Sequence, residues 1–428
     1  MQESFLHYVW RYLKFNQANL VTLNGKPIKI LAQGIQNTNA GPDFENARII
    51  IDNLEWCGPV EIHETSSDWI KHCHNKDSAY DNVILHVVWQ HNTNVYRQDG
   101  SEIETLTLKD IVEPSLIDNF LSLKNSVEPI PCSIQVEKVK PFDAWAMVDK
   151  ALMNRLERKK NIIDQHYQKT NANWEEVAYR TLLIGVGFKV NSMPMEQLGI
   201  LLPFKVIKKH VDNLFQLEAL LFGVSGLLQT NEVEDSYFTS LKKEFHHLSA
   251  MYNLDSKCMN ASEWKFLRLR PANFPTLRIA QVAAFLHKKS SLFRWLIEVP
   301  AHKELSAGIR NTTSPYWQIH YRFNTVGEKV PSKMGKKSFE NLVINVVVPL
   351  LISYSKIKLD DSLLDRAIRF LEAITPEKNN IINNWESLGL TPSSSAQSQG
   401  LIELYNEFCI KKRCLDCNIG FKIINKPQ

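Results

Sequence analysis

Residues 37–69 read NTNAGPDFENARIIIDNLEWCGPVEIHETSSDW, and this stretch decides which fold and which chemistry the chain can have. The runs ARIIID and WCGPVEIH are rich in β-branched residues, as is typical of buried strands. Asp43 lies at the mouth of the first run, Glu61 lies within the second, and His63 follows two residues later. Because side chains of neighbouring strands can meet at one edge of a sheet, the stretch predicts two converging carboxylates with an imidazole close by.

Strand and helix signals around this stretch alternate in a definite order. Apolar residues at helical spacing predict an opening helix over residues 2–15, and the segment Asp99-Gly100 between two β-like runs predicts a hairpin. The order is helix, three strands, helix, strand and an added hairpin. The expected segments are residues 26–34, 47–52 and 56–63 for the three strands, 66–74 for the short helix, 82–89 for the next strand and 95–108 for the hairpin.

A change of pattern after VEPIPC indicates a domain boundary near residues 128–140. With 428 residues the chain exceeds what one hydrophobic core usually organises, so two domains are expected. Residues 1–135 are expected to form an α/β domain with a mixed sheet flanked by helices, and residues 136–428 a larger, mainly helical domain that carries the C-terminal cysteines. The predicted fold class is therefore α+β.

The composition restricts the class of protein, its cellular compartment and the partners that it can bind. Hydrophobic residues make up 44% of the chain and charged residues 22%, as in an ordinary globular protein. The net charge of +4 is small, so a surface for polyanions has to be a local patch. No apolar run approaches the roughly 20 residues that span a bilayer, and the N-terminus lacks signal-peptide features. We expect a cytoplasmic protein whose seven cysteines are thiols or metal ligands.

Two converging carboxylates favour a hard divalent cation. Mg²⁺ or Mn²⁺ takes oxygen ligands and keeps water positions open, so Asp43 and Glu61 could hold an ion that activates water and stabilises charge on a phosphodiester. The alternative without a functional role is that Asp43 caps a turn and Glu61 is a solvated strand residue.

The words Pro42-Asp43 and Glu61-Ile62-His63, in this order of elements, resemble the PD-(D/E)XK nuclease superfamily over roughly residues 1–90. The resemblance implies a metal-dependent nuclease acting on DNA or RNA, with Asp43 and Glu61 as metal ligands and Glu3 as an accessory carboxylate. The lysine of that pattern is replaced by His63. A neutral imidazole can act as a base, so His63 is expected to orient or deprotonate the attacking water, with activity falling below about pH 6.

Two other functions stay open. The missing lysine fits a nucleic-acid-binding or scaffold protein with a degenerate nuclease core. The dense polar segment after Glu61 also fits a zinc hydrolase, in which His72 and His74 with Asp68 or His86 would bind the ion.

The C-terminus contains a second metal signal. Cys409, Cys414 and Cys417 form a C-x4-C-x2-C pattern that needs a fourth ligand, for which Cys132 is the first candidate, before Cys57 and Cys258. Zinc and an iron–sulfur cluster are both compatible with the pattern, and some PD-(D/E)XK nucleases carry such a cluster on distant cysteines. The alternative is three unmetallated thiols at a charged helix end.

Phosphate contacts are expected from local basic groups. KFLRLRPANFPTLR contains Arg270 and Arg278 near an aromatic residue, and KMGKK contains Lys336. Solvated helix faces explain many such runs. A phosphate-binding P-loop is missing, since MGKKS lacks the first glycine at the required offset.

Over nearly its whole length the chain also resembles an uncharacterised bacterial family, domain-of-unknown-function family twenty-eight fifty-one. The words that carry this resemblance are GPDF, VEIH, SDW with HCH, AYDNVILHVVW, RPANFP and RCLDC. This family implies no mechanism.

Overall fold

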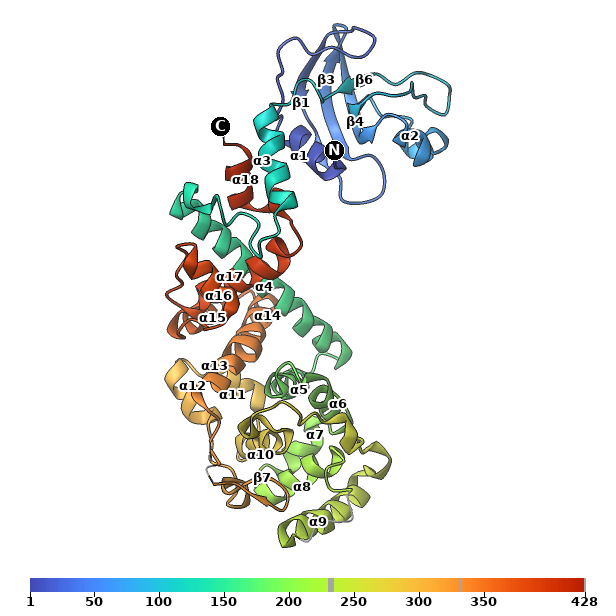
Figure 1. The fold of residues 1–428 in the computed structure, drawn as a ribbon. Helices are drawn as coiled ribbons and strands as arrows, with labels where there is room; N and C mark the ends of the chain where they lie inside the picture. The colour runs from blue at the N-terminus through green and yellow to red at the C-terminus, as the bar shows by residue number, and fades with distance from the viewer. Residues whose placement is uncertain (230–234, 329, 332, 427–428) are drawn as a thin grey trace. The chain divides into compact units, whose positions relative to one another are not determined.

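The computed structural model describes residues 1–229, 235–328, 330–331 and 333–426. The chain divides into two compact units, Met1–Met147 with Leu404–Gln428 as unit 1 and Val148–Glu403 as unit 2 (Figure 1). Unit 1 contains the sheet, and unit 2 is almost entirely helical. The predicted α+β class is therefore confirmed.

The sheet of unit 1 is mixed. Its strands follow the order β1-β3-β4-β5-β6, and β2 pairs with β3 outside this path. The pairs β1–β3 and β3–β4 are antiparallel, whereas β4–β5 and β5–β6 are parallel. The bounds are β1 (Ile28–Ala32), β2 (Ile35–Gln36), β3 (Phe44–Ile51), β4 (Leu54–Thr65), β5 (Leu85–Gln90) and β6 (Thr105–Thr107).

Strand β4 is the centre of unit 1. Its first residues are exposed, but Val60, Glu61, Ile62 and His63 are all buried, on both faces of the strand. Helix α1 (Glu3–Arg11) packs against β4 through its apolar side, which includes Phe5. A strand covered on both faces normally carries only apolar side chains, so buried Glu61 and His63 need polar partners inside the protein.

One of two local predictions differs from the structure. The short polar helix is split into α2 (Asp68–Lys71) and the 3₁₀ turns η1 (His74–Lys76) and η2 (Ser78–Tyr80), because Cys73 adopts a left-handed conformation with φ of 62°. The expected hairpin has its turn, in which Gly100 N–H donates to Arg97 O at 3.0 Å. The two arms pair next to this turn, through an antiparallel bridge between Tyr96 and Glu102, so the hairpin is present. Beyond it, Thr105–Thr107 form β6, which pairs in parallel with β5.

The C-terminal segment belongs to unit 1. It forms η10 (Leu404–Cys409), η11 (Cys414–Asp416) and α18 (Asn418–Ile424), and α18 packs against α3 (Pro114–Asn125) and the 3₁₀ turn η3 (Val136–Lys138). Asn119 Nδ2 donates to the carbonyl oxygen of Ile424 at 3.3 Å, and Asn425 hydrogen-bonds to Tyr8. Figure 1 shows α18 beside α3 and α1.

This arrangement differs from the predicted domains at residues 1–135 and 136–428. The cysteine-bearing end of the chain lies in the same unit as the sheet. In addition, α4 (Pro141–Lys169) is one continuous helix that runs through the boundary between the units, so helical periodicity does not change where the units divide.

Unit 2 has one large apolar core. Its elements are α5 (Trp174–Gly187), α6 (Ser192–Leu201), α7 (Phe204–Ile207), η4 (Lys208–His210), α8 (Leu214–Val224), α9 (Ser236–Tyr252), η5 (Asp255–Lys257), η6 (Ala261–Glu263), η7 (Pro271–Asn273), α10 (Pro275–Leu286), α11 (Leu292–Glu298), α12 (His302–Ile309), η8 (Tyr316–Gln318), β7 (His320–Arg322), β8 (Thr325–Val326), α13 (Lys336–Leu342), η9 (Val343–Val347), α14 (Val348–Lys358), α15 (Asp361–Ala373), α16 (Asn380–Ser387) and α17 (Ser395–Glu403).

One helical stretch of unit 2 is apolar enough to raise the question of a membrane. Lys336–Lys358 meets the length and composition of a membrane-spanning helix, with a mean hydropathy of 1.3. However, 72% of its most apolar window is buried inside the protein. It therefore packs as a core helix.

The packing of the C-terminal helix α18 within unit 1 can be tested by substitution. Ile424 is fully buried, whereas Ile410 of the same segment is 58% exposed. Truncating a buried isoleucine removes packed methyl groups and leaves a cavity, so Ile424→Ala should destabilise unit 1 by about 2–4 kcal/mol. Hydrogen exchange in peptides from residues 1–147 measures the change. Ile410→Ala is the matched control, and equal effects of the two variants would contradict the placement of α18.

Candidate metal centre

Asp43 and Glu61 meet at one edge of the sheet because β3 and β4 pair directly beside them. The register puts Phe44 opposite Val60. The backbone N–H of Asp43 donates to Glu61 Oε2 at 3.0 Å, and the backbone N–H of Ile62 donates to Asp43 Oδ2 at 2.9 Å. The Glu61 carboxylate thus accepts from the backbone of Asp43, the Asp43 carboxylate accepts from the residue after Glu61, and the structure brings the two predicted acids together.

Helix α1 adds Glu3 and His7 to this edge. His7 Nε2 lies 3.2 Å from Asp43 Oδ2 and 3.9 Å from Glu3 Oε1. The ligand atoms of Glu3, His7 and Asp43 all lie within 4.8 Å of one another, and we call these residues the carboxylate cluster. Burial and the neighbouring Asp43 charge raise the pKa of Glu3. Burial alone would lower the pKa of His7, but its contact with Asp43 raises it above the ordinary value.

A second group of donors consists of His63, His72 and His74, whose ligand nitrogens also lie within 4.8 Å of one another. We call them the imidazole cluster. His63 Nε2 is 3.1 Å from His72 Nδ1. His74 is 8% exposed, and its Nε2 has no hydrogen-bond partner among the described residues although it lies 3.2 Å from Glu61 Oε1. Because Glu61 Oε2 binds the backbone of Asp43, Glu61 stands between the two clusters.

Aromatic and polar neighbours hold the imidazoles in place. His86 Nε2 is 2.8 Å from His63 Nδ1, on the side away from His72. Tyr80 stacks on His74 with ring centroids 3.7 Å apart, and the fully buried Trp69 contacts both His74 and His86. Such outer partners fix the ring orientation and the tautomer of metal-binding histidines.

Asp68 and His86, the proposed third ligands of a zinc site with His72 and His74, have other roles. Asp68 Oδ2 accepts hydrogen bonds from the backbone and hydroxyl of Thr65, and Oδ1 accepts one from Lys71. Burial would raise the pKa of Asp68, but these bonds lower it to about 2. His86 supports His63 from behind. The third imidazole of the cluster is therefore His63.

Burial governs the protonation of this centre. It raises the pKa of Glu61, and together with the neighbouring imidazoles His86, His74 and His72 it lowers the pKa of His63 to about 2. With His63 1% exposed and both ring nitrogens facing other imidazoles, its environment is that of a neutral ligand and not of a base that meets bulk water. The expected loss of activity below pH 6 therefore does not follow from His63.

The donor set fits a transition metal better than Mg²⁺ alone. Imidazole nitrogens suit zinc, iron, copper and nickel, while magnesium prefers oxygen ligands. The carboxylates of Glu3, Asp43 and Glu61 are close enough for Asp43 to raise the pKa of both glutamic acids. A cation between such groups would offset their mutual repulsion.

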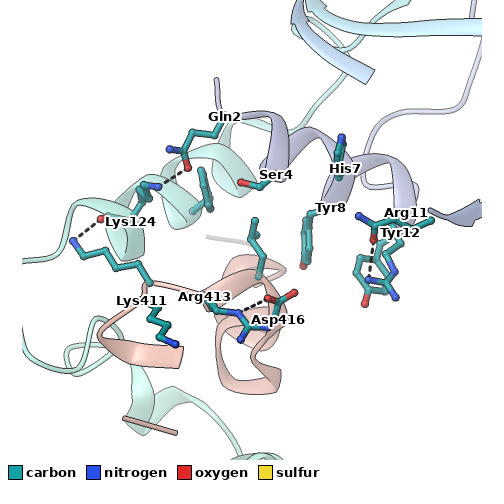
Figure 2. Close-up of a pocket in the computed structure, with 14 residues that line it drawn as sticks. Gln2, Ser4, His7, Tyr8, Arg11, Tyr12, Lys124, Lys411, Arg413 and Asp416 are labelled. Atoms are coloured by element: carbon teal, nitrogen blue, oxygen red, sulfur yellow. Dashed lines mark hydrogen bonds and ion pairs between the residues drawn. The ribbon is translucent and has the colours of Figure 1, made fainter. Parts of the chain in front are cut away.

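A cationic pocket lies next to the centre. Figure 2 shows Lys124, Lys411, Arg413 and Arg11 around it, together with His7 of the carboxylate cluster. A second, open depression contains His63 and His72 of the imidazole cluster, and the two depressions share Gln2, Ser4 and Lys124 in their walls. Phosphate groups bound in the pocket would therefore be close to the candidate metal ligands.

The predicted phosphate contacts Arg270, Arg278 and Lys336 all lie in unit 2. Arg278 is 3% exposed, and its guanidinium donates to Gln281 at 2.8 Å, to Asn273 at 2.6 Å and to Ser338 at 2.8 Å. It is thus a structural residue of the core. Arg270 is exposed, and Lys336 Nζ lies 3.7 Å from Glu340.

Sequence reasoning missed His7, Arg11 and the lysines of the pocket. A signal for the first two was present, since Glu3, His7 and Arg11 recur every four residues and share one side of α1. Lys124 and Lys411 carried none, because α3 and the C-terminal segment meet only in the folded unit. The structure also brings the predicted cysteines Cys132, Cys409, Cys414 and Cys417 into unit 1.

Comparison with curated proteins and with solved structures gave no match. A family model described as "Protein of unknown function (DUF2851)" matches residues 3–380, which includes all members of both donor clusters. The resemblance stated from the sequence words is thereby confirmed, and the chain belongs to the DUF2851 family.

Proposed function

We propose that this protein is a metal-dependent phosphodiesterase that acts on nucleic acid. One observation carries the proposal: two donor clusters, joined by Glu61, lie at a sheet edge beside a cationic pocket. Paired metal positions are a common solution for hydrolysing phosphodiesters, because two ions can stabilise the attacking and the leaving oxygen.

The topology supports this reading. The sequence of α1, antiparallel strands β1, β3 and β4, helix α2 and the parallel strand β5 has the order that the nuclease resemblance implies. Asp43 and Glu61 occupy the positions of the two acidic residues of the PD-(D/E)XK pattern. The departure at the lysine position remains, since His63 lies there and faces other imidazoles.

The residues divide into two roles. Glu3, His7 and Asp43 would hold one ion, His63, His72 and His74 the other, and Glu61 would reach both. A bound divalent cation would polarise a phosphoryl oxygen and make a water molecule acidic. The chain itself fixes the donors, through the reciprocal Asp43 and Glu61 hydrogen bonds and through His86 behind His63. Mn²⁺ or Zn²⁺ suits this set better than Mg²⁺.

The substrate class follows from charge. Arg11, Lys124 and Lys411 line the pocket, and clustered cations neutralise phosphates whatever the base sequence. DNA and RNA share this backbone chemistry. We place the activity in the cytoplasm, where a chain with seven cysteines stays reduced.

A zinc hydrolase that uses only the imidazole cluster is the second candidate. Three imidazoles with one open position are a known catalytic zinc arrangement, and His63, His72 and His74 supply three. The two candidates differ in stoichiometry and in the need for Asp43. A non-catalytic binding protein would need neither a bound metal ion nor Asp43 for its function.

Replacing Asp43 tests the catalytic proposal. In Asp43→Asn an amide oxygen can still accept the hydrogen bond from Ile62, but the charge is lost, so cleavage of single- and double-stranded substrates with Mn²⁺ should fall by more than about 100-fold. Glu45→Gln, an exposed acid two residues away, is the matched control. If Asp43→Asn cleaves as well as the control, or wild type cleaves nothing with any divalent metal, the phosphodiesterase proposal fails.

Metal binding can be measured without activity. After chelation, an excess of Mn²⁺ or Zn²⁺ at about 100 times Kd should stabilise the protein by about 2.7 kcal/mol in denaturation experiments, and Mg²⁺ should give less. His72 is exposed, so His72→Ala should fold normally but lose most of this gain. His246→Ala removes an exposed histidine of unit 2 as a control. A gain unaffected by His72→Ala would exclude the imidazole cluster as the binding site.

The cationic pocket predicts how binding depends on salt. Arg11→Gln should weaken binding to any nucleic acid sequence and reduce the slope of log affinity against log salt by about 1, measured with chelator present to prevent cleavage. Lys109→Gln, an exposed lysine of unit 1 outside the pocket, should leave the slope unchanged. Equal slopes for both variants would mean that nucleic acid binds elsewhere.

A further inference from the structure

Within unit 1, four of the chain's seven cysteines gather at one place that the proposed activity does not use. Cys132 lies in the turn before η3, Cys409 ends η10, Cys414 begins η11, and Cys417 is the N-cap of α18. Cys132, Cys409 and Cys417 are 7–8% exposed, and Cys414 is half-buried. None of the four is in a disulfide.

Backbone packing brings these four positions together. Helix α18 packs against both η3 and η11, and η10 packs against η11. The carbonyl oxygen of Cys414 accepts a hydrogen bond from the backbone of Cys417 at 3.3 Å, and Gly420 lies so close that an added Cβ would stand 2.1 Å from that oxygen. Only glycine permits this approach, which holds α18 against the turn that carries Cys414.

The thiols are mutual neighbours. All six pairs interact electrostatically, and burial followed by the other thiols raises the pKa of Cys132, Cys409 and Cys414, the last to about 11. A catalytic cysteine has a lowered pKa and is accessible to its substrate, whereas these thiols are largely buried and have raised pKa values. A bound metal removes this resistance, because a coordinating thiol is deprotonated outright.

The spacing of the sulfur atoms favours one kind of metal site over another. Tetrahedral zinc with Zn–S bonds near 2.3 Å places its sulfur ligands about 3.8 Å apart. Within the described residues, however, no three of these sulfur atoms lie within 4.8 Å of one another. A cluster of several iron and sulfide atoms holds its four cysteines farther apart than a single ion does. In addition, C-x4-C-x2-C with one distant cysteine is a known iron–sulfur spacing.

We propose that Cys132, Cys409, Cys414 and Cys417 bind an iron–sulfur cluster. The site is separate from both donor clusters around Glu61, and it requires neither of them. Its ligands come from two segments, so the cluster ties the C-terminal segment to the turn at Cys132 and closes a very long loop.

The cluster would also position cationic groups. Lys411, Lys412 and Arg413 lie between Cys409 and Cys414 and line the cationic pocket. Lys412 adopts a left-handed conformation with φ of 51°, and its Nζ donates to the carbonyl oxygens of Lys124 and Ser126, both at 2.8 Å. As cluster ligands, Cys409 before this basic segment and Cys414 after it would fix the segment beside α3.

The full-length protein, purified without oxygen, tests the proposal. We expect iron and acid-labile sulfide in equal amounts, with a broad visible absorbance that dithionite bleaches. Cys414→Ser and Cys132→Ser should lose more than half of the iron, whereas Cys57→Ser, an exposed cysteine of β4, should keep all of it.

The outcomes separate clearly. Because Cys414 is only half-buried, its serine variant should keep the fold, which hydrogen exchange in peptides from residues 1–147 and circular dichroism can verify. One zinc per chain without sulfide would overturn the proposal, as would a folded Cys414→Ser protein with its full iron content. Protein that takes up no iron and sulfide on anaerobic reconstitution would overturn it as well.

Discussion

The reciprocal hydrogen bonds between Asp43 and Glu61 organise unit 1. Each carboxylate accepts a hydrogen bond from a backbone N–H of the other segment. The two bonds therefore link the start of β3 to β4. Hydrogen bonds to ionised acceptors are stronger than neutral ones. These hydrogen bonds lie beside the pair Phe44 and Val60, and they leave Asp43 Oδ2 3.2 Å from His7 Nε2 of α1 and Glu61 Oε1 3.2 Å from His74 Nε2.

The same contacts concentrate acidic and imidazole side chains in a largely buried part of unit 1. Glu61 is 4% exposed and close to Asp43, and burial lowers the pKa values of His63 and His86, while His74 is buried beside them. Burying polar groups in this number costs free energy unless each finds a partner. Among the described residues, the nitrogen His74 Nε2 makes no regular hydrogen bond, and it lies 3.2 Å from Glu61 Oε1. Under the proposed function, a divalent cation would offer opposite charge to the acids and empty orbitals to the imidazoles, and so would offset the cost of burying these residue types in a core covered on both faces.

Local features of the sequence could be predicted, and contacts between distant segments could not. The strands, the opening helix and the meeting of Asp43 with Glu61 follow from alternation and turn residues within some 60 positions. The parallel pairing of β6, the role of His63 and the burial of Arg278 depend on neighbours that lie far away in the chain. The continuous helix α4 hides the boundary between the units, because periodicity reports a helix and not which unit its residues join.

The C-terminal segment shows why this distinction matters for function. Read locally, Lys411, Lys412 and Arg413 are an ordinary charged helix end, and the three cysteines around them lack a fourth ligand. In the folded unit, α18 packs on α3 and η3, so the same contacts that supply Cys132 also place the basic residues in the pocket beside His7. One packing arrangement thus determines both the completeness of the thiol site and the charge of the pocket. Loss of either would therefore affect the other, even though the cysteines and the donor clusters share no ligand.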